Sequence, residues 1–395
     1  MFRSNEFPLA ASPKRHQFPR AVRRAPTLAL TLNLALVLGG IFPAEAKWNV
    51  VMHEKRRYVT LEDVATFYKM NRPVSDGKSF RLTANGYSIK GRPQGRDVLV
   101  NGVKYVLCFP IITKNGENLI SAMDVVKIIE PILRPQKIKN ASAVRTVILD
   151  AGHGGHDSGA RGPLGAEKDA ALDVVNRARK LLLENGFQVH RTRGTDIFIP
   201  LEKRPKFANK HRNAVFVSVH FNKSKSGGTG LETYCLAPRG VPSMDEENLR
   251  YSDFVQYPGH KRDAENVALA TAVHASLVRK LGLTDRGIKR ARFVVIKNAT
   301  LPAILVEGGF MSGKPDYKLI ATPAYRQKMA ECIVEGIMTY SASVSGTIQY
   351  QKPSAIVSAT DPTTVPDLEK PVGSATDRKA SVATARKLIQ ATVKK

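Results

Sequence analysis

The sequence predicts an α/β fold: a mixed, mostly parallel sheet with helices on both faces, preceded by a small α+β domain. Between residues 145 and 341, apolar strand segments alternate with amphipathic helices, which is the pattern of a sheet covered by helices. Three strand segments end on a polar residue: TVILD runs into a turn that carries His153, AVFVSV into His220, and AILV into Glu307. Because the carboxyl ends of parallel strands line one crevice, we expect these side chains to lie close together.

Residues 1–46 have the layout of a secretory signal. Basic residues within 20–24 precede an apolar stretch over 28–42, and Ala44-Glu45-Ala46 follows as a small-residue cleavage site. We therefore expect export, cleavage before Lys47 and no membrane span in the mature chain. An uncleaved anchor is the alternative, because the apolar stretch falls only a little short of the ~20 residues that a spanning helix needs.

Residues 47–136 are predicted to form the small α+β domain. The segments KWNVVM, SFRLTANGYSIKG, DVLVNGVKYVLCF and PIITKNG are predicted strands and hairpins, with Asn85-Gly86 and Asn101-Gly102 as turn signals. Helices are expected at TLEDVATFYKM and SAMDVVKIIEPIL. This domain contains no group of catalytic residue types, and the polar, basic segment 137–144 is expected to link it to the next domain.

The larger domain is predicted to span residues 145–341. Its first helix, from Glu167 to Glu184, has apolar residues at helical spacing along one side, and Asn185-Gly186 ends it as a C-cap would. FQVHR and AVFVSVH are predicted strands, with a helix at 201–211 between them. The remaining expected elements are a strand at GLETYCL, a helix at 264–281, strands at ARFVVI and AILVE, and a helix at 323–340.

The chain is strongly basic. Lys and Arg number 61 against 34 Asp and Glu, which gives a formal net charge of +27 over 395 residues. This excess suits a polyanionic partner or an anionic surface, and charge alone leaves nucleic acid, membrane and cell wall open. The secretory layout and the lack of a recognised nucleic-acid motif argue against a specific nucleic-acid partner. Residues 342–395, rich in Ser, Thr, Ala, Pro and Lys, are expected to form a disordered tail.

The polar residues near the predicted strand ends are of metal-ligand and general-base types. Taken alone, three of them have ordinary alternatives: His153 as a turn residue, His220 as a buried histidine bonded to backbone, and Glu167 as a helix cap. Glu307 is harder to explain in this way, because a buried carboxylate is costly unless it is paired or binds a metal. Two imidazoles with one or two carboxylates at one rim indicate a zinc hydrolase, since zinc with three protein ligands keeps an open position for water.

The order and surroundings of these residues resemble the zinc-dependent N-acetylmuramoyl-L-alanine amidases of bacterial cell walls. The resemblance covers about half of the chain and includes ILDAGHGGHDSGA, GAEKD, AVFVSVHFN, GLETY and AILVEGGFMS. It implies that His153, Glu167 and His220 bind one zinc ion per chain and that Glu307 is the catalytic glutamate. The implied reaction is hydrolysis of the amide between N-acetylmuramic acid and the L-alanine of the peptidoglycan stem peptide, in the periplasm or cell envelope. A peptidoglycan-binding module without turnover is the alternative.

Further residues match positions of that family. Asn222 and Arg286 are the candidates for substrate contact, with support of the site as the alternative for each. For Arg193, Arg204 and Asn209 a part in packing or pairing is expected.

Some segments extend beyond the family pattern or depart from it. Gly313 stands where asparagine is usual and Phe221 where a smaller residue is usual, which bears on the shape of the substrate groove. Segment 238–263 is longer than the shortest members need; some relatives have an inhibitory helix in this region, so an activator protein could act on it, with a plain surface insertion as the alternative. Residues 47–136 resemble the N-terminal domain of copper amine oxidases, which suggests a wall-binding or targeting part or a mere spacer.

Overall fold

The computed structural model describes residues 48–244 and 248–346, which belong to one compact unit. The predicted secretory signal and residues 347–395 of the predicted tail lie outside the described residues. Among the helices that the structure describes, none has both the length and the apolar character needed to cross a membrane.

The N-terminal part contains a four-stranded antiparallel sheet and a run of five more strands. The first sheet has the order β1 (Val50–His53), β2 (Arg56–Thr60), β9 (Glu117–Ser121) and β8 (Ile112–Lys114). The other strands are β3 (Val74–Ser75), β4 (Phe80–Ala84), β5 (Tyr87–Gly91), β6 (Asp97–Val100) and β7 (Val103–Val106), each antiparallel to the next. Asn101 and Gly102 have φ values of 53° and 82°, which the predicted tight hairpin turn requires.

Both helices predicted for this part are present. Helix α2 (Leu61–Phe67) begins at Thr60, whose side chain accepts a hydrogen bond from the Asp63 backbone. The helix predicted at SAMDVVKIIEPIL forms in three pieces: α3 (Ala122–Asp124), a π-helical turn (Val125–Ile129) and α4 (Glu130–Leu133).

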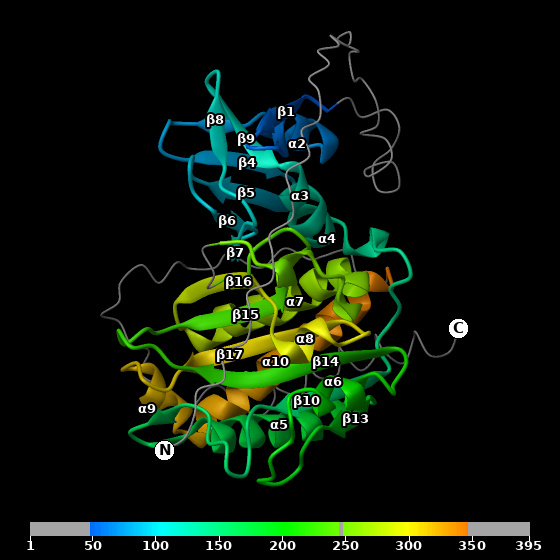
Figure 1. Ribbon diagram of the computed structural model, residues 1–395, viewed down its shortest axis with the longest axis vertical. Helices are drawn as coiled ribbons and strands as arrows, with labels where there is room; N and C mark the ends of the chain where they lie inside the picture. Colours follow the sequence, from blue (N-terminus) through cyan, green and yellow to red (C-terminus); the bar gives the residue numbers. More distant parts are fainter. Residues whose placement is uncertain (1–47, 245–247, 347–395) are drawn as a thin grey trace, which may run out of the picture. The chain divides into compact units, whose positions relative to one another are not determined.

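The C-terminal part has the mixed, mostly parallel sheet that the sequence predicts. Its strand order is β13 (Gln188–Arg191), β10 (Thr146–Ala151), β14 (Ala214–Asn222), β17 (Ala303–Phe310), β15 (Leu231–Leu236) and β16 (Asp285–Ala291). Every neighbouring pair is parallel except β15 and β17. Strand β16 also pairs with β7, so the two parts share one eleven-stranded sheet, which Figure 1 shows as a continuous series of strands from β4 to β13.

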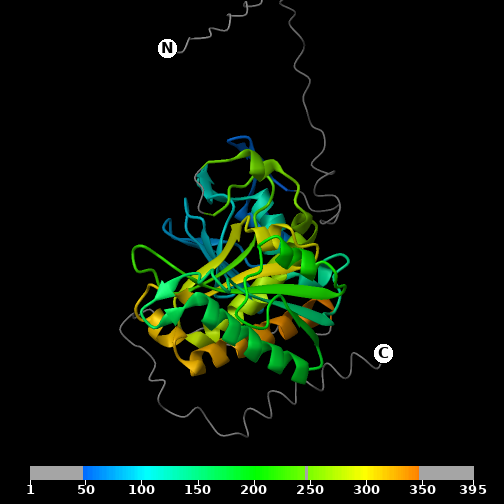
Figure 2. The same cartoon turned by 60° about the horizontal axis from the view of Figure 1, so that its bottom comes forward.

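Helices cover both faces of this sheet. Helices α5 (Glu167–Glu184), α7 (Asp263–Leu281) and α10 (Pro323–Val344) pack together on one face (Figures 1 and 2). Helices α6 (Lys203–Ala208) and α8 (Val294–Lys297) pack on the other, where Phe216 and Leu305 of the sheet join an apolar cluster with Ala208 and Val295. Because side chains alternate along a strand, residues two apart from Phe216 and Leu305 also point to the α6/α8 face.

The structure corrects several predicted elements. ARFVVI was predicted to be a strand, but the strand is β16, which ends at Ala291, and the apolar residues after it form α8. A short apolar run fits a strand and a buried helical turn equally well, so its periodicity could not decide. Helix α6 is shorter than the predicted 201–211, and α10 continues to Val344, past the predicted domain end at 341. The hairpin β11 (Arg161–Gly162) and β12 (Gly165–Ala166) and helix α9 (Asp316–Ile320) were not predicted.

Candidate metal centre

The turn after β10 positions His153. Its φ of 57° lies in the left-handed region, which is unusual for a residue with a side chain. Two arginines, each 2% exposed, hold the carbonyl groups of this turn. Arg204 Nη2 donates to His153 O at 2.9 Å, and Arg193 Nη2 donates to Gly152 O at 2.6 Å. These bonds stabilise a conformation that the sequence alone would not favour, and they give Arg193 and Arg204 the structural part that was expected.

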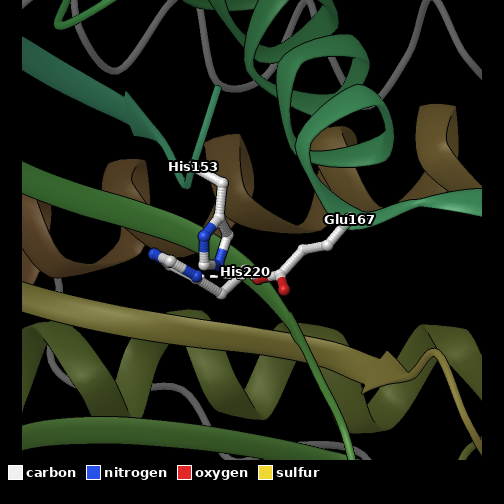
Figure 3. A group of neighbouring side chains, drawn as sticks. All are labelled: His153, Glu167 and His220. Carbon is white, nitrogen blue, oxygen red and sulfur yellow. Dashed lines mark hydrogen bonds and ion pairs between the residues drawn. The ribbon is translucent and has the colours of Figure 1, made fainter. Parts of the chain in front are cut away.

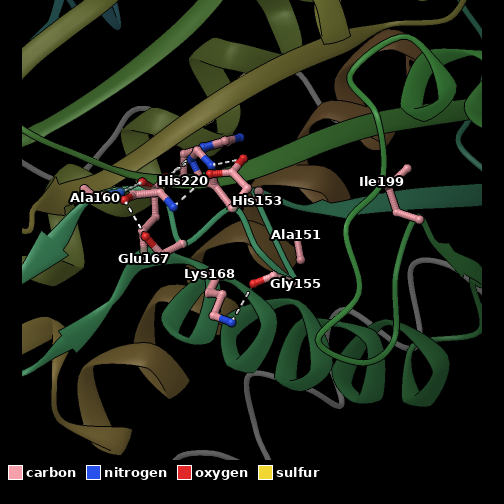
Figure 4. Close-up of polar contacts among 12 residues, drawn as sticks. Ala151, His153, Gly155, Ala160, Glu167, Lys168, Ile199 and His220 are labelled. Carbon is pink, nitrogen blue, oxygen red and sulfur yellow. Dashed lines mark hydrogen bonds and ion pairs between the residues drawn. The ribbon is translucent and has the colours of Figure 1, made fainter.

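Glu167, the first residue of α5, points its carboxylate toward both histidines (Figure 3). Its Oε1 is 3.1 Å from His153 Nε2 and 2.8 Å from His220 Nδ1. Its Oε2 accepts a hydrogen bond of 2.7 Å from the Ala160 backbone, a contact drawn in Figure 4. Burial opposes the charge of Glu167, but hydrogen bonds from the two histidines outweigh it and lower the pKa of the carboxyl. The carboxylate is therefore held in its ionised, metal-binding form.

His153 is oriented by a second carboxylate. Asp157 Oδ2 lies 2.8 Å from His153 Nδ1, so Nε2 is the nitrogen that faces Glu167. Burial lowers the pKa of His153, but hydrogen bonds with Glu167 and Asp157 reverse this and raise it. A carboxylate on the far nitrogen of a histidine fixes the tautomer and the ring orientation, as is usual around metal-ligating histidines.

The three side chains suit a metal ion. Their ligand atoms, one from each of His153, Glu167 and His220, all lie within 4.8 Å of one another. Two imidazole nitrogens and one carboxylate oxygen form a donor set that zinc takes, and three protein ligands leave one position for water. The structure thus brings together the three residues that the sequence singled out as ligands.

Two glycines make room for this group. A Cβ added at Gly152 would lie 2.4 Å from His220 Cε1, and one at Gly159 would lie 2.5 Å from Glu167 Oε2.

We expect Gly152→Ala to displace the His220 ring and weaken zinc binding about 10–100-fold, the usual cost of misorienting a ligand. Competition with a chromogenic chelator measures this. Gly86→Ala is the control, because nothing lies within 4 Å of its added Cβ, although the positive φ of Gly86 (88°) strains an alanine there. Equal zinc affinity of the two variants would contradict the prediction.

Glu307 lies beside the metal centre in the sheet. It pairs in register with His220 of β14 on one side and with Glu232 of β15 on the other. It is two residues from Leu305, so it points to the α6/α8 face, as His220 does. The side chain is half-buried, and its Oε2 is shielded from solvent without a hydrogen-bond partner among the described residues. Burial, followed by the charges of Glu167 and Glu232, raises the pKa of Glu307 well above its usual value.

Glu232 is a buried carboxylate beside Glu307 that the sequence analysis did not single out. It is 1% exposed and accepts hydrogen bonds from Arg286 Nε (2.7 Å), Lys289 Nζ (2.6 Å), Asn222 Nδ2 (2.9 Å) and the Tyr234 hydroxyl (2.7 Å). Burial disfavours its charge, but the bonds from Lys289 and Arg286 lower its pKa. A carboxylate inside the apolar segment GLETYCL was the available signal, since the argument used for Glu307 applies equally to it.

The two candidates for substrate contact meet at this carboxylate. Asn222 and Arg286 come from different strands, and both bond to Glu232 next to Glu307. The Arg286 side chain is 40% exposed, so its guanidinium is accessible to a ligand. Asn209 lies elsewhere: it bonds to Asn298 O (3.0 Å) and Thr300 N (2.8 Å), which ties the end of α6 to the loop before β17.

The described residues of segment 238–263 lie away from the metal centre. Strand β15 is antiparallel to β17; it begins beside Glu307 and ends at the opposite end of the sheet, where the segment follows. There Arg292 Nη2 donates to Pro238 O at 2.7 Å, and His260 Nε2 lies 3.0 Å from Ala237 O. This placement favours a surface insertion over a segment that covers the metal.

The departure at Gly313 has a local explanation. A Cβ at this position would lie 2.1 Å from Gly228 O, in the loop after β14. Asparagine would not fit here without moving that loop. Phe221 is buried on the other face of the sheet, where a Cβ at Gly308 would approach its ring to 2.9 Å.

Comparison with known proteins gives consistent matches to this part of the chain. The family model described as N-acetylmuramoyl-L-alanine amidase matches residues 147–339. The N-acetylmuramoyl-L-alanine amidase AmiA of Escherichia coli is 30% identical over 229 residues, covering 52% of this chain and 78% of AmiA. The uncharacterized protein YqiI of Bacillus subtilis is 34% identical, covering 50% of this chain and 84% of YqiI. The solved structure of the amidase AmiC2 of Nostoc punctiforme is 33% identical, covers 50% of this chain and 98% of that chain, and has a TM-score of 0.42.

Proposed function

Because this chain belongs to the N-acetylmuramoyl-L-alanine amidase family, we propose that it hydrolyses the amide between N-acetylmuramic acid and the L-alanine of peptidoglycan stem peptides. The observation that carries the proposal is the grouping of His153, Glu167 and His220 beside the half-buried Glu307. Three ligands with a neighbouring carboxylate of raised pKa are what metal-assisted amide hydrolysis needs. Peptidoglycan is accordingly the proposed substrate and main partner.

The three ligands would hold one zinc ion per chain. Zinc in such a site would act as a Lewis acid on the amide carbonyl and make water a stronger nucleophile at neutral pH. Glu307 would take a proton from the attacking water and pass it to the amide nitrogen that leaves. Its raised pKa suits both steps, because a more basic carboxylate accepts the proton more readily and can then donate it as an acid.

The residues around Glu232 would position the substrate. Arg286 and Lys289 supply cationic groups and Asn222 an amide, all anchored on one buried carboxylate. Stem peptides carry carboxylates, which guanidinium and ammonium groups bind through charge-assisted hydrogen bonds. We assign Asn222 and Arg286 to contact with the stem peptide on this basis.

We also propose where the protein acts and how it is divided. Residues 1–46 would direct export, and the mature enzyme would work in the periplasm or cell envelope, in wall turnover or septum splitting. Residues 47–136 would form an accessory domain, 137–144 a linker, and the catalytic domain would run from 145 to the end of α10 at Val344. An activator acting on segment 238–263 would have to work at a distance, because the described part of that segment begins at the far end of the sheet.

Digestion of purified peptidoglycan tests the proposed function. We expect the protein to release free stem peptides, and chelation to lower the rate at least about a hundredfold, since a catalytic zinc supplies several kcal/mol of stabilisation. Adding back zinc should restore the rate. Chromatography of the soluble products measures the release. Binding of peptidoglycan and zinc without release of stem peptides would instead identify a silent binding module.

A further inference from the structure

A row of exposed side chains crosses the small-domain strands. Arg81 of β4 pairs in register with Lys90 of β5, Lys90 with Leu99 of β6, and Leu99 with Lys104 of β7. Arg81, Lys90 and Leu99 are exposed, and Lys104 is half-buried. Their neighbours along the strands are buried and point the other way: Leu82, Ile89, Val98 and Val103. We name Arg81, Lys90, Leu99 and Lys104 the basic row.

The strand register carries this row into the catalytic domain. Tyr105 of β7 pairs with Ile288 of β16, so the preceding residues, Lys104 and Gly287, lie side by side. A Cβ added at Gly287 would accordingly lie 3.1 Å from Lys104 Cγ. On the other side of β16, Glu232 of β15 lies opposite Arg286 and Gly287, because Leu231 pairs with Asp285 and Thr233 with Ile288. Arg81, Lys90 and Leu99 are open to solvent, in contrast to the buried residues that alternate with them along the strands.

From Glu232, the strand pairing continues to the metal centre. Glu232 pairs with Glu307, and Glu307 pairs with His220. Neighbouring strands are about 4.8 Å apart, so Lys90, five strands from Glu307, lies about 24 Å from it along the row. The strands that carry the basic row and those that carry Glu232, Glu307 and His220 thus follow one another across a single sheet (Figure 1).

The charge of the row is positive and partly unpaired. Lys104 Nζ forms an ion pair of 2.6 Å with Asp97. Among the described residues, by contrast, no ion pair involves Arg81 or Lys90. Leu99, 40% exposed, adds an apolar contact between the cations. An extended polymer with carboxylates at intervals and apolar sugar faces complements such a surface.

We propose that the basic row extends the substrate-binding face, so that a peptidoglycan strand lies across the small domain while one of its stem peptides occupies the metal centre. This inference rests on the proposed function. It adds that the enzyme selects its substrate by length and prefers long peptidoglycan strands to short fragments. A long strand contacts the row and the catalytic site together, and the second contact then costs little additional entropy. A single disaccharide peptide reaches only the catalytic site.

The double variant Arg81→Glu/Lys90→Glu tests the row. We expect its KM for polymeric peptidoglycan to rise about tenfold with little change in kcat, because two favourable surface interactions become repulsive. Its kcat/KM for a soluble disaccharide peptide should equal that of the wild type, and raising the salt should shrink the difference on polymer. The matched control is Arg57→Glu/Lys114→Glu, which makes the same charge change at exposed positions of the other small-domain sheet.

The outcomes separate the row from the proposed function. Wild-type protein that releases no stem peptide from polymeric peptidoglycan would refute the function. Co-sedimentation of the wild type and the row variant with insoluble peptidoglycan would then still test the row. Wild-type-like KM and co-sedimentation of the row variant would overturn the inference, as would equal losses in the control. Weaker binding of the row variant to phosphatidylglycerol vesicles, with peptidoglycan binding intact, would overturn it in favour of a lipid surface.

Discussion

Glu307→Gln is expected to lower kcat for stem-peptide release about a thousandfold, within the range attributed to general acid–base groups. The variant keeps the shape of the side chain but removes the group that would take up and return the proton. It should bind zinc with near wild-type affinity, because the three ligands His153, Glu167 and His220 are unchanged. Rates of peptide release under saturating substrate, with zinc titration alongside, measure both effects.

The same variant is expected to make the metal-free protein more stable at pH 7. The pKa of Glu307 is raised in the folded state, so the folded state loses stability as the pH rises above the unfolded pKa. Glutamine does not titrate, and it escapes this loss. Chemical unfolding at pH 7 and pH 4 tests the difference, which should vanish at the lower pH. Glu184→Gln, at an exposed helix position, is the control; a Glu307→Gln protein with wild-type turnover would refute the assigned role.

Arg204→Ala is expected to cost about 3–5 kcal/mol of unfolding free energy, the usual loss when one partner of a buried ion pair is removed. Arg204 Nη1 lies 2.9 Å from Asp150 Oδ1, and the two side chains are 2% and 0% exposed. Without the guanidinium, the donors to the Asp150 carboxylate among the described residues are two hydroxyls, those of Thr192 and Ser218. Denaturant unfolding of the full chain, followed by circular dichroism, measures the loss.

The control for this prediction is an exposed arginine. Arg72 pairs with Glu62 at 3.1 Å, but its side chain is 89% exposed. Its replacement by alanine should cost less than about 1 kcal/mol. Similar losses for the two arginines would mean that Arg204 does not stabilise the turn that holds His153.

The sequence predicted the grouping of His153, His220 and Glu307 because their positions follow from strand periodicity. Once TVILD, AVFVSV and AILV are recognised as parallel strands, His153, His220 and Glu307 must come to one end of the sheet. The bounds of α5 were predicted correctly for a similar reason, since its apolar stripe is long and ends at a clear C-cap. The prediction of a strand at ARFVVI was wrong because so short an apolar run has no periodicity that distinguishes a strand from a helical turn.

Features that depend on contacts between distant segments were not predictable in this way. The contacts of Glu232 emerge only when two other strands, β14 with Asn222 and β16 with Arg286 and Lys289, are brought beside it. The pairing of β7 with β16 likewise depends on two strands about 180 residues apart, joined by Tyr105 and Ile288 and by the bond from Lys104 N to Asp285 Oδ2 (2.9 Å). Neither local propensity nor periodicity contains this information.

The sharing of one sheet by both parts of the chain bears on how this protein can be dissected. Strand β7 covers the outer side of β16, and the Tyr105 hydroxyl reaches Thr271 of α7 at 2.9 Å. A fragment starting after residue 144 would leave β16 as a bare edge strand, whose unpaired amide and carbonyl groups invite another chain to add on. Self-association of such a fragment would result from the edge strand exposed by truncation and would not be a property of the native protein.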